Sequence, residues 1–262
     1  MTQPSCTGCG QCVAVCPNHS IALQGGRAVF SGHNCISCGH CVAVCPTGAL
    51  DHPYCPRSEQ RPVGRTLSAQ EAEDFLRSRR SIRVFRQRPI DREKALQLVN
   101  IGRYAQTGSN RQGIGYVIVD GREKVEALAE RTICYLERQY AAHPDVVWYK
   151  RVIDRHRLEG EDIIFRGAPA LILAVAPEKL PSGRDNARFS LTYIELLAPA
   201  LGLGTCWAGF FEGLACGPEG QEVREMLKLA PDMRICGALM LGEPAVHYQR
   251  LVERQPLKVE FR

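Results

Sequence analysis

The chain has 262 residues, of which 45% are hydrophobic and 23% charged, with 13 cysteines and a formal net charge of +5. This length allows one large domain or two unequal ones, and the composition is that of a globular protein rather than a disordered or fibrous one. The longest apolar run, residues 168–177, is too short to cross a bilayer and predicts a buried strand. Residues 1–5 resemble no leader peptide, and no basic run with interleaved aromatics occurs. We therefore expect a cytoplasmic protein that binds neither membrane nor nucleic acid.

Two cysteine runs lie near the N-terminus, and both read Cys-x-x-Cys-x-x-Cys-x-x-x-Cys-Pro. The first comprises Cys6, Cys9, Cys12 and Cys16, and the second, 29 positions later, comprises Cys35, Cys38, Cys41 and Cys45. Three thiolates at this spacing can bind one face of an iron–sulfur cube from a single loop, and the fourth must come from elsewhere. Disulfides would need an oxidising compartment, and zinc sites leave no role for the Cys-x-x-x-Cys-Pro ending. The pattern therefore predicts two iron–sulfur clusters.

Residues 1–56 resemble the bacterial two-cluster ferredoxins, in which the last cysteine of each run ligates the other cluster. The resemblance assigns one 4Fe–4S cluster to Cys6, Cys9, Cys12 and Cys45, and the second to Cys35, Cys38, Cys41 and Cys16. With both clusters bound the net charge falls to about +1, so the positive formal charge does not indicate an acidic partner. Cys55 has no partner spacing, and we interpret it as a spare structural thiol.

The rest of the chain predicts a second domain. The stretch from Pro53 to Gly64 is rich in Pro and Arg, which indicates a linker at residues 57–67 and a second domain at 68–262. Helices are predicted over 69–79, 92–104, 123–140, 145–158, 184–201 and 222–229, and strands over 115–120, 170–176 and 235–241. Helices outnumber strands, so we expect an α+β fold: a ferredoxin-like domain, with a hairpin at Gly25-Gly26, followed by a mixed sheet wrapped by helices.

A basic motif, Arg79-Arg80-Ser81-Ile82-Arg83, follows the first helix of the second domain. Its guanidinium groups can bind a phosphate bidentately, and its hydroxyl can hold a polyol chain. Arginines are also favourable at a helix C-terminus without any ligand. The motif alone leaves both interpretations open.

Four motifs in the second domain resemble, in order, those of the nitroreductase family of FMN-dependent enzymes. They are the basic motif, Ser109-Asn110-Arg111-Gln112, the stretch from Leu201 to Trp207, and Leu241-Gly242-Glu243-Pro244 with Arg254 downstream. The chain departs from the family at Gln106-Thr107-Gly108 and Gly113-Ile114, on the loop that shapes the pocket, which leaves the substrate open.

The resemblance implies a homodimer with FMN at the subunit interface. It implies that the FMN phosphate and ribityl chain contact Arg79, Arg80, Ser81, Arg83 and Arg254. It also implies that Asn110 and Gln112 reach the flavin from the partner subunit, and that backbone amides near Ala208 and Gly209 face the flavin N5 edge.

Several other residues have two interpretations. Cys206 is either redox-active or, as we favour, a buried apolar filler. Trp148 and Tyr149 either line a pocket mouth or, as we favour, belong to the core. We interpret three further cysteines as core residues: Cys134, Cys216 and Cys236. The seven histidines show no metal-binding spacing.

Together the resemblances imply an oxidoreductase. Electrons from an external low-potential donor would pass through two 4Fe–4S clusters to FMN and on to an electron-poor small molecule, such as a nitro compound, a quinone or an activated alkene. One alternative is an electron-transfer or redox-sensing protein that turns over no small molecule. A third reading retains the clusters and treats the second domain as a flavin-free binding module.

Overall fold

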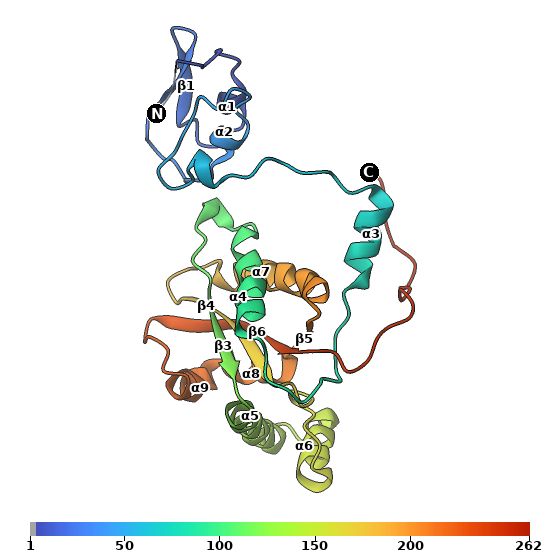
Figure 1. The fold of residues 1–262 in the computed structure, drawn as a ribbon. Coiled ribbons are helices and arrows are strands. Elements are labelled where there is room, and N and C mark those ends of the chain that lie inside the picture. Colours follow the sequence, from blue (N-terminus) through green and yellow to red (C-terminus); the bar gives the residue numbers. More distant parts are fainter. Residues whose placement is uncertain (1–3) are drawn as a thin grey trace. The chain divides into compact units, whose positions relative to one another are not determined.

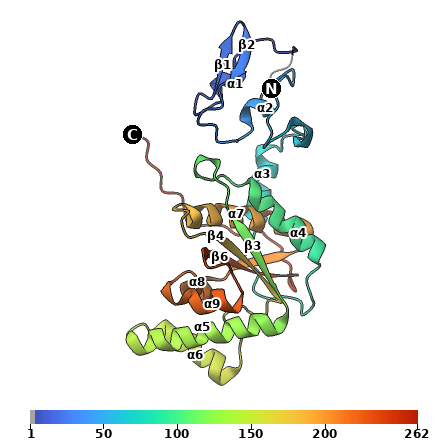
Figure 2. The ribbon, with the colours of Figure 1, turned by 90° about the vertical axis from the view of Figure 1, so that its left-hand side faces the viewer.

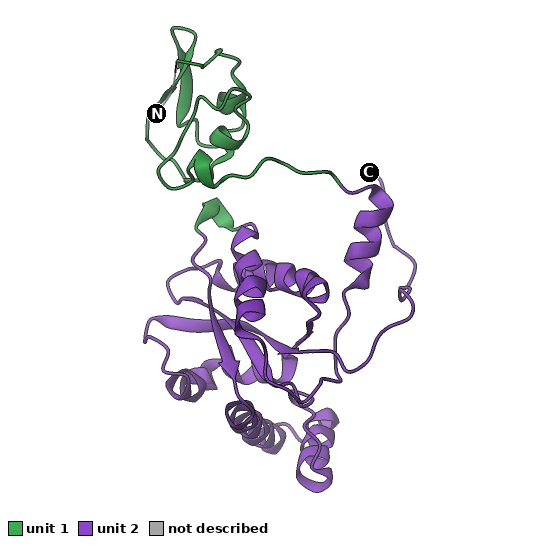
Figure 3. Cartoon of the chain, in the orientation of Figure 1, with its two compact units in different colours: residues 1–66, 107–111 green, residues 67–106, 112–262 purple. Residues whose placement is uncertain are grey.

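The computed structural model describes residues 4–262, and the chain divides into two compact units (Figures 1 and 3). Unit 1 comprises the described residues up to Thr66 together with Thr107–Arg111. Unit 2 comprises Leu67–Gln106 and Gln112–Arg262. Within the described range, no helix has both the length and the apolar character that a membrane span requires.

The described residues of unit 1 form two short helical turns, one hairpin and two 3₁₀ turns. These elements are α1 (Gln11–Ala14), β1 (Ile21–Gln24), β2 (Arg27–Phe30), α2 (His40–Ala43), η1 (Arg57–Glu59) and η3 (Gly108–Asn110). The antiparallel pairing of β1 with β2 confirms the predicted hairpin. The glycines before the two helical turns, Gly10 and Gly39, have φ of 78° and 74°, a left-handed conformation that glycine adopts without a Cβ clash. The internal repeat in the sequence is therefore a repeat in the backbone.

A four-stranded sheet forms the centre of unit 2, with the order β3-β4-β6-β5. The strands are β3 (Gly115–Asp120), β4 (Ala170–Pro177), β5 (Gly204–Trp207) and β6 (Met233–Gly242). Adjacent strands pair antiparallel, and a parallel bridge joins Ser81 to Thr205. Seven of the eight residues of β4 are buried, because helices cover both faces of the sheet (Figure 2). The α+β class and the mixed, helix-wrapped sheet are confirmed.

The helices of unit 2 bury two separate cores against this sheet. They are α3 (Ala69–Ser78), α4 (Arg92–Ile101), α5 (Arg122–Ala142), α6 (Val147–Glu159), α7 (Gly183–Leu197), α8 (Gly209–Ala215) and α9 (Gln221–Met226). Leu98 of α4 and Ile194 of α7 belong to one core, and Leu128 of α5 and Phe211 of α8 belong to the other. Figure 2 shows α4 and α7 on one side of the sheet and α5, α6 and α8 on the opposite side.

Local signals explain where several helices begin and end. Ser68 and Glu71 form the predicted capping box at α3, and the Asp91 carboxylate accepts hydrogen bonds from the first turn of α4. The helix predicted over residues 184–201 instead ends at Leu197 and continues as a 3₁₀ turn over Ala198–Leu201, where Pro199 removes a backbone donor. The sequence did not predict β5 or α8, since four and seven residues are too few to show a period.

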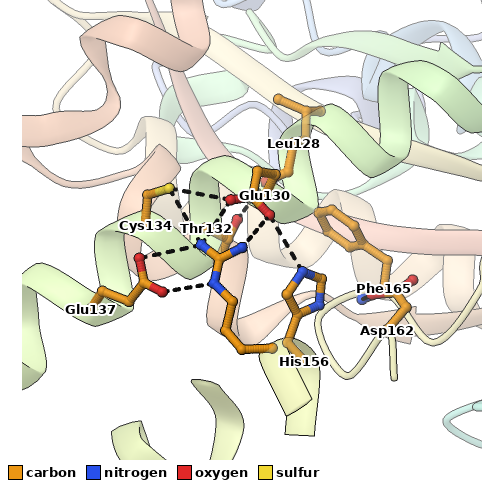
Figure 4. Close-up of polar contacts among 9 residues, drawn as sticks. Leu128, Glu130, Thr132, Cys134, Glu137, His156, Asp162 and Phe165 are labelled. Carbon is orange, nitrogen blue, oxygen red and sulfur yellow. Dashed lines mark hydrogen bonds and ion pairs between the residues drawn. The ribbon is translucent and has the colours of Figure 1, made fainter. Parts of the chain in front are cut away.

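The cysteines outside the two runs occupy different environments. Cys206 and Cys236 are buried in the cores, as predicted. The assignment of Cys134 to the core is wrong: its Sγ donates to Glu130 Oε1 over 3.5 Å, and the Arg157 guanidinium links Glu130 to Glu137 (Figure 4). Burial raises the pKa of Cys134, and the Glu130 carboxylate raises that pKa further. Cys134 is therefore a protonated member of a polar cluster that joins α5 to α6.

Candidate redox centres

Two cavities in unit 1 gather the cysteines of the two runs. The first is lined by Cys6, Cys9, Cys12 and Cys45. The second is lined by Cys16, Cys35, Cys38 and Cys41. Each cavity is thus lined by three cysteines from one run and the last cysteine of the other.

The electrostatics of the buried thiols reflect the same grouping. Burial raises the pKa of Cys12, and the neighbouring thiols of Cys9 and Cys45 add to the rise. Burial likewise raises the pKa of Cys41, and the thiols of Cys38 and Cys16 add to it. In each cavity, therefore, one thiol is within electrostatic range of a cysteine from the other run.

Hydrogen bonds to the last cysteine of each run favour its thiolate form. Cys16 Sγ accepts the Ser20 amide over 3.2 Å, and Cys45 Sγ accepts the Ala49 amide over 3.2 Å, at equivalent positions of the repeat. Burial would raise the pKa of both thiols, but these amides and the hydroxyls of Ser20 and Thr47 outweigh burial and lower it. Because a cluster binds thiolates, these donors favour the ligating form.

The four cysteines around each cavity match the ligand set of a four-iron cube. Among residues 4–262, no three His, Cys, Asp or Glu side chains lie close enough together to hold one metal ion. A cube takes its four thiolates at separate iron corners, so its ligands stand around a cavity rather than at one point. Cys55 lies against Gly39 beside the second cavity, and burial, with the thiols of Cys41 and Cys38, raises the pKa of Cys55 to about 11. A thiol with this pKa stays protonated at neutral pH.

In unit 2, the basic motif passes alongside β5. The Ile82 amide donates to Thr205 O over 2.8 Å, which fixes the segment to the sheet edge. Arg80 has a buried Nε with no hydrogen-bond partner among the described residues, and its guanidinium carbon lies 5.6 Å from the centre of the Tyr248 ring. The Ser81 hydroxyl lies within hydrogen-bonding reach of Cys206. A buried guanidinium nitrogen without an acceptor fits a site for an anionic group.

One acidic side chain accompanies these arginines. Arg79 Nη1 lies 3.4 Å from Glu195 Oε1 on α7, and the Glu195 side chain is 12% exposed. Burial raises the pKa of Glu195, while the Arg79 charge opposes that rise. Arg80 and Arg83 of the same motif add two further positive charges to this segment.

The turn between β5 and α8 is fixed by hydrogen bonds. The Ala208 amide donates to Ala238 O over 3.0 Å, so it belongs to the sheet. Gly209 opens α8, where first-turn amides have no acceptor within the helix. Trp207 Nε1 donates to Glu212 Oε2 over 2.5 Å, and Glu212 Oε1 accepts from Arg184 over 3.2 Å. This buried carboxylate holds the turn in place from both sides.

The remaining predicted residues lie on a loop and on the C-terminal segment. Asn110 belongs to unit 1, where its Nδ2 donates to Ile36 O over 2.9 Å and to Ser37 O over 3.1 Å. Gln112 has a φ of 52°, and it begins the second part of unit 2. Arg254 is exposed, and its neighbour Glu253 pairs with Arg77 at the end of α3 over 3.1 Å.

The two halves of the chain match known family profiles. The profile of the nitroreductase family matches residues 76–243, and that of a 4Fe–4S dicluster domain matches residues 5–49. The chain belongs to the nitroreductase family. It joins a ferredoxin-like domain to a nitroreductase domain, as the motifs predicted.

Solved structures of similar proteins support the nitroreductase fold of the second domain. A nitroreductase with bound FMN from Bacteroides fragilis superposes with a TM-score of 0.59 at 20% identity, covering 72% of this chain and 98% of that one. Another nitroreductase with bound FMN, from Desulfitobacterium hafniense, gives a TM-score of 0.58 at 20% identity, covering 72% and 97%. A Cr(VI) reductase from Pseudomonas sp. (strain G-1) is 27% identical over 176 residues, 66% of each chain, so the match spans just under two thirds of that relative.

Sequence reasoning missed Glu195 and Glu212 of this nitroreductase domain. Glu195 on α7 pairs with Arg79 from a distant segment, and Glu212 on α8 accepts from Trp207. An acidic residue on an apolar helix face indicates that its carboxylate has a polar partner, but the sequence does not show which residue that partner is.

Proposed function

We propose that the chain is an oxidoreductase that carries two 4Fe–4S clusters and FMN and reduces an electron-poor small molecule. When bound, the clusters transfer single electrons, and the flavin accepts electrons from them and delivers them in pairs. The observation that supports this most strongly is the crossed set of four cysteines around each cavity of unit 1, in a chain that belongs to the nitroreductase family.

The residues of unit 1 would bind the clusters and shape their surroundings. Cys6, Cys9, Cys12 and Cys45 would hold one cluster, and Cys16, Cys35, Cys38 and Cys41 the other. The amides of Ser20 and Ala49 would remain directed at the ligating sulfurs of Cys16 and Cys45. We place this domain at residues 1–56, followed by a linker at 57–67 and the flavin domain at 68–262, in a reducing compartment such as the cytoplasm.

The residues of unit 2 would bind FMN at a homodimer interface. Arg79, Arg80, Ser81, Arg83 and Arg254 would hold the phosphate and ribityl chain, and Asn110 and Gln112 would contact the flavin of the partner subunit. The Gly209 amide would donate to the N5 edge, because the Ala208 amide already donates to Ala238 O. The Trp207–Glu212 hydrogen bond would keep that amide oriented.

An aromatic pair marks the place where an acceptor would stack. Trp148 of α6 stacks on Phe210 of α8, with ring centres 5.6 Å apart, and Phe210 follows Gly209 directly. Trp148 is 46% exposed, so part of its ring is accessible to a planar acceptor. Nitro compounds, quinones and activated alkenes suit such a surface, and chromate is a further candidate because the Pseudomonas relative is a Cr(VI) reductase.

The test is a cofactor and turnover assay on protein purified without oxygen. We expect about eight irons, about eight acid-labile sulfides and about one FMN per chain, and oxidation of the reduced protein by at least one acceptor class. Cofactors without turnover of any acceptor would favour the electron-transfer or sensing alternative. Iron without flavin would refute the FMN proposal.

A further inference from the structure

His52 lies at the wall of the second cysteine cavity, with its ring held on several sides. It is 8% exposed, and the Phe30 ring meets it edge-on with ring centres 5.8 Å apart. The His52 amide donates to Asp51 Oδ1 over 2.9 Å, and the same oxygen accepts the Arg57 amide over 2.9 Å. The side chain therefore has a fixed direction.

The hydrogen bonds of this ring determine which nitrogen carries the proton. The Tyr54 amide donates to His52 Nδ1 over 3.2 Å, so Nδ1 is an acceptor and carries no hydrogen. In a neutral imidazole the hydrogen is then on Nε2. Nε2 lies 3.6 Å from Cys35 Sγ, a normal separation for a hydrogen bond to sulfur, so the N–H is directed at this thiolate.

The equivalent position in the first half of the repeat holds no such donor. The 29-residue offset that matches Cys6 with Cys35 also matches Leu23 with His52. Leu23 lines the first cavity, as His52 lines the second, and a leucine side chain cannot donate a hydrogen bond. Cys6 Sγ accepts the Ala28 amide and Cys35 Sγ accepts the Ser37 amide, both over 3.4 Å, so these two thiolates differ chiefly in the imidazole.

We propose that His52 raises the reduction potential of the cluster held by Cys16, Cys35, Cys38 and Cys41 above that of the other cluster. Reduction adds one electron to a cluster, and no bond or proton is exchanged with His52. The added charge is shared by the thiolate sulfurs, so an N–H directed at one of them stabilises the reduced state more than the oxidised state. His52 is therefore a positioning residue: in the one-electron-reduced protein, the electron is held mainly by the cluster beside His52. This inference depends on the proposed clusters.

The experiment compares two substitutions of nearly equal size in the full chain purified without oxygen. His52→Gln retains an N–H donor at similar reach, whereas His52→Met has none. The exposed His33, changed to Leu, is the matched control in the same unit. Iron and sulfide are measured first, and the midpoint potentials of both clusters then follow from an electron-paramagnetic-resonance titration with dithionite as reductant.

We expect two separate midpoints in the unmodified chain. His52→Met should shift the higher midpoint to a more negative potential and leave the lower one in place, His52→Gln should shift it less, and His33→Leu should shift neither. If the variants retain full iron and their midpoints equal those of the unmodified chain, the inference is overturned. Equal shifts of the two cluster midpoints in His52→Met would also overturn it. Loss of iron from both His52 variants but not from His33→Leu would also overturn it, since His52 would then be structural. Absence of iron from the unmodified chain would instead refute the proposed function.

Discussion

The phosphate site of FMN is tested by replacing Arg79 and Arg83 with Ala in one chain. A hydrogen bond between charged groups contributes about 1.5–3 kcal/mol each. Arg79 also pairs with Glu195 and its side chain is 27% exposed, so we take the lower end for both residues. The expected loss is about 3 kcal/mol, which corresponds to roughly a 10²-fold rise in the Kd of FMN.

The assay is equilibrium binding of FMN to flavin-depleted protein, followed by flavin fluorescence, with iron measured in parallel. Iron content should not change, because both arginines lie outside unit 1. A control chain with Ala at the exposed Arg92 and Arg103 removes the same charge elsewhere in unit 2 and should bind FMN as the unmodified chain does. Retention of FMN with an unchanged Kd by the Arg79/Arg83 variant would refute the placement of the phosphate.

Four further predictions concern the clusters, the acceptor site and stability. Cys45→Ala should remove the cluster of the first run and Cys16→Ala that of the second, each leaving about four irons per chain. If electron paramagnetic resonance shows instead that each variant loses the cluster of the run to which the replaced cysteine belongs, the crossed ligation is wrong. Trp148→Ala should raise KM for a planar aromatic acceptor more than for chromate in steady-state assays, and equal effects on both would exclude stacking. Leu173→Ala, in the buried centre of β4, should lower the free energy of unfolding by about 2–5 kcal/mol in urea titrations, while Leu158→Ala at an exposed site should change it by at most about 0.5 kcal/mol. Burial raises the pKa of Glu195 against the opposing Arg79 charge, so the free energy of unfolding should fall as pH rises from the ordinary glutamate range through the folded-state pKa. Glu195→Gln should remove that part of the decline. Identical pH profiles of the two proteins would show that Glu195 is not coupled to folding.

The grouping of the cysteines around two cavities could be predicted from the sequence, because the spacing of the two runs determines which thiols can lie together. A three-residue spacing places thiolates on one loop, and two such loops in one repeat leave the last cysteine of each for the other cavity. The long elements were equally accessible: β4 is an uninterrupted apolar run, and the caps at Ser68 and Asp91 mark helix starts.

Features that depend on tertiary contacts could not be predicted. The carboxylates of Glu195 and Glu212 acquire their roles only when α7 and α8 bring them to Arg79 and Trp207. Cys134 was assigned to the core because its sequence neighbours are apolar, and only the packing of α6 places Arg157 beside it. The donor role of His52 likewise requires the Tyr54 amide, which fixes the ring's hydrogen on the opposite nitrogen.

Electron transfer from the clusters to the flavin is tested by counting the electrons released in one reoxidation. The protein is reduced with dithionite without oxygen, freed of excess reductant, and mixed in a stopped-flow instrument with a limiting and then a saturating nitroaromatic acceptor. Electron transfer from both clusters through FMN predicts that about four electrons per chain reach the acceptor, two from FMN and one from each cluster. It also predicts that the cluster signals are lost only in protein that contains FMN. Release of only about two electrons, with both clusters remaining reduced, would contradict it, because the clusters would not then supply the flavin.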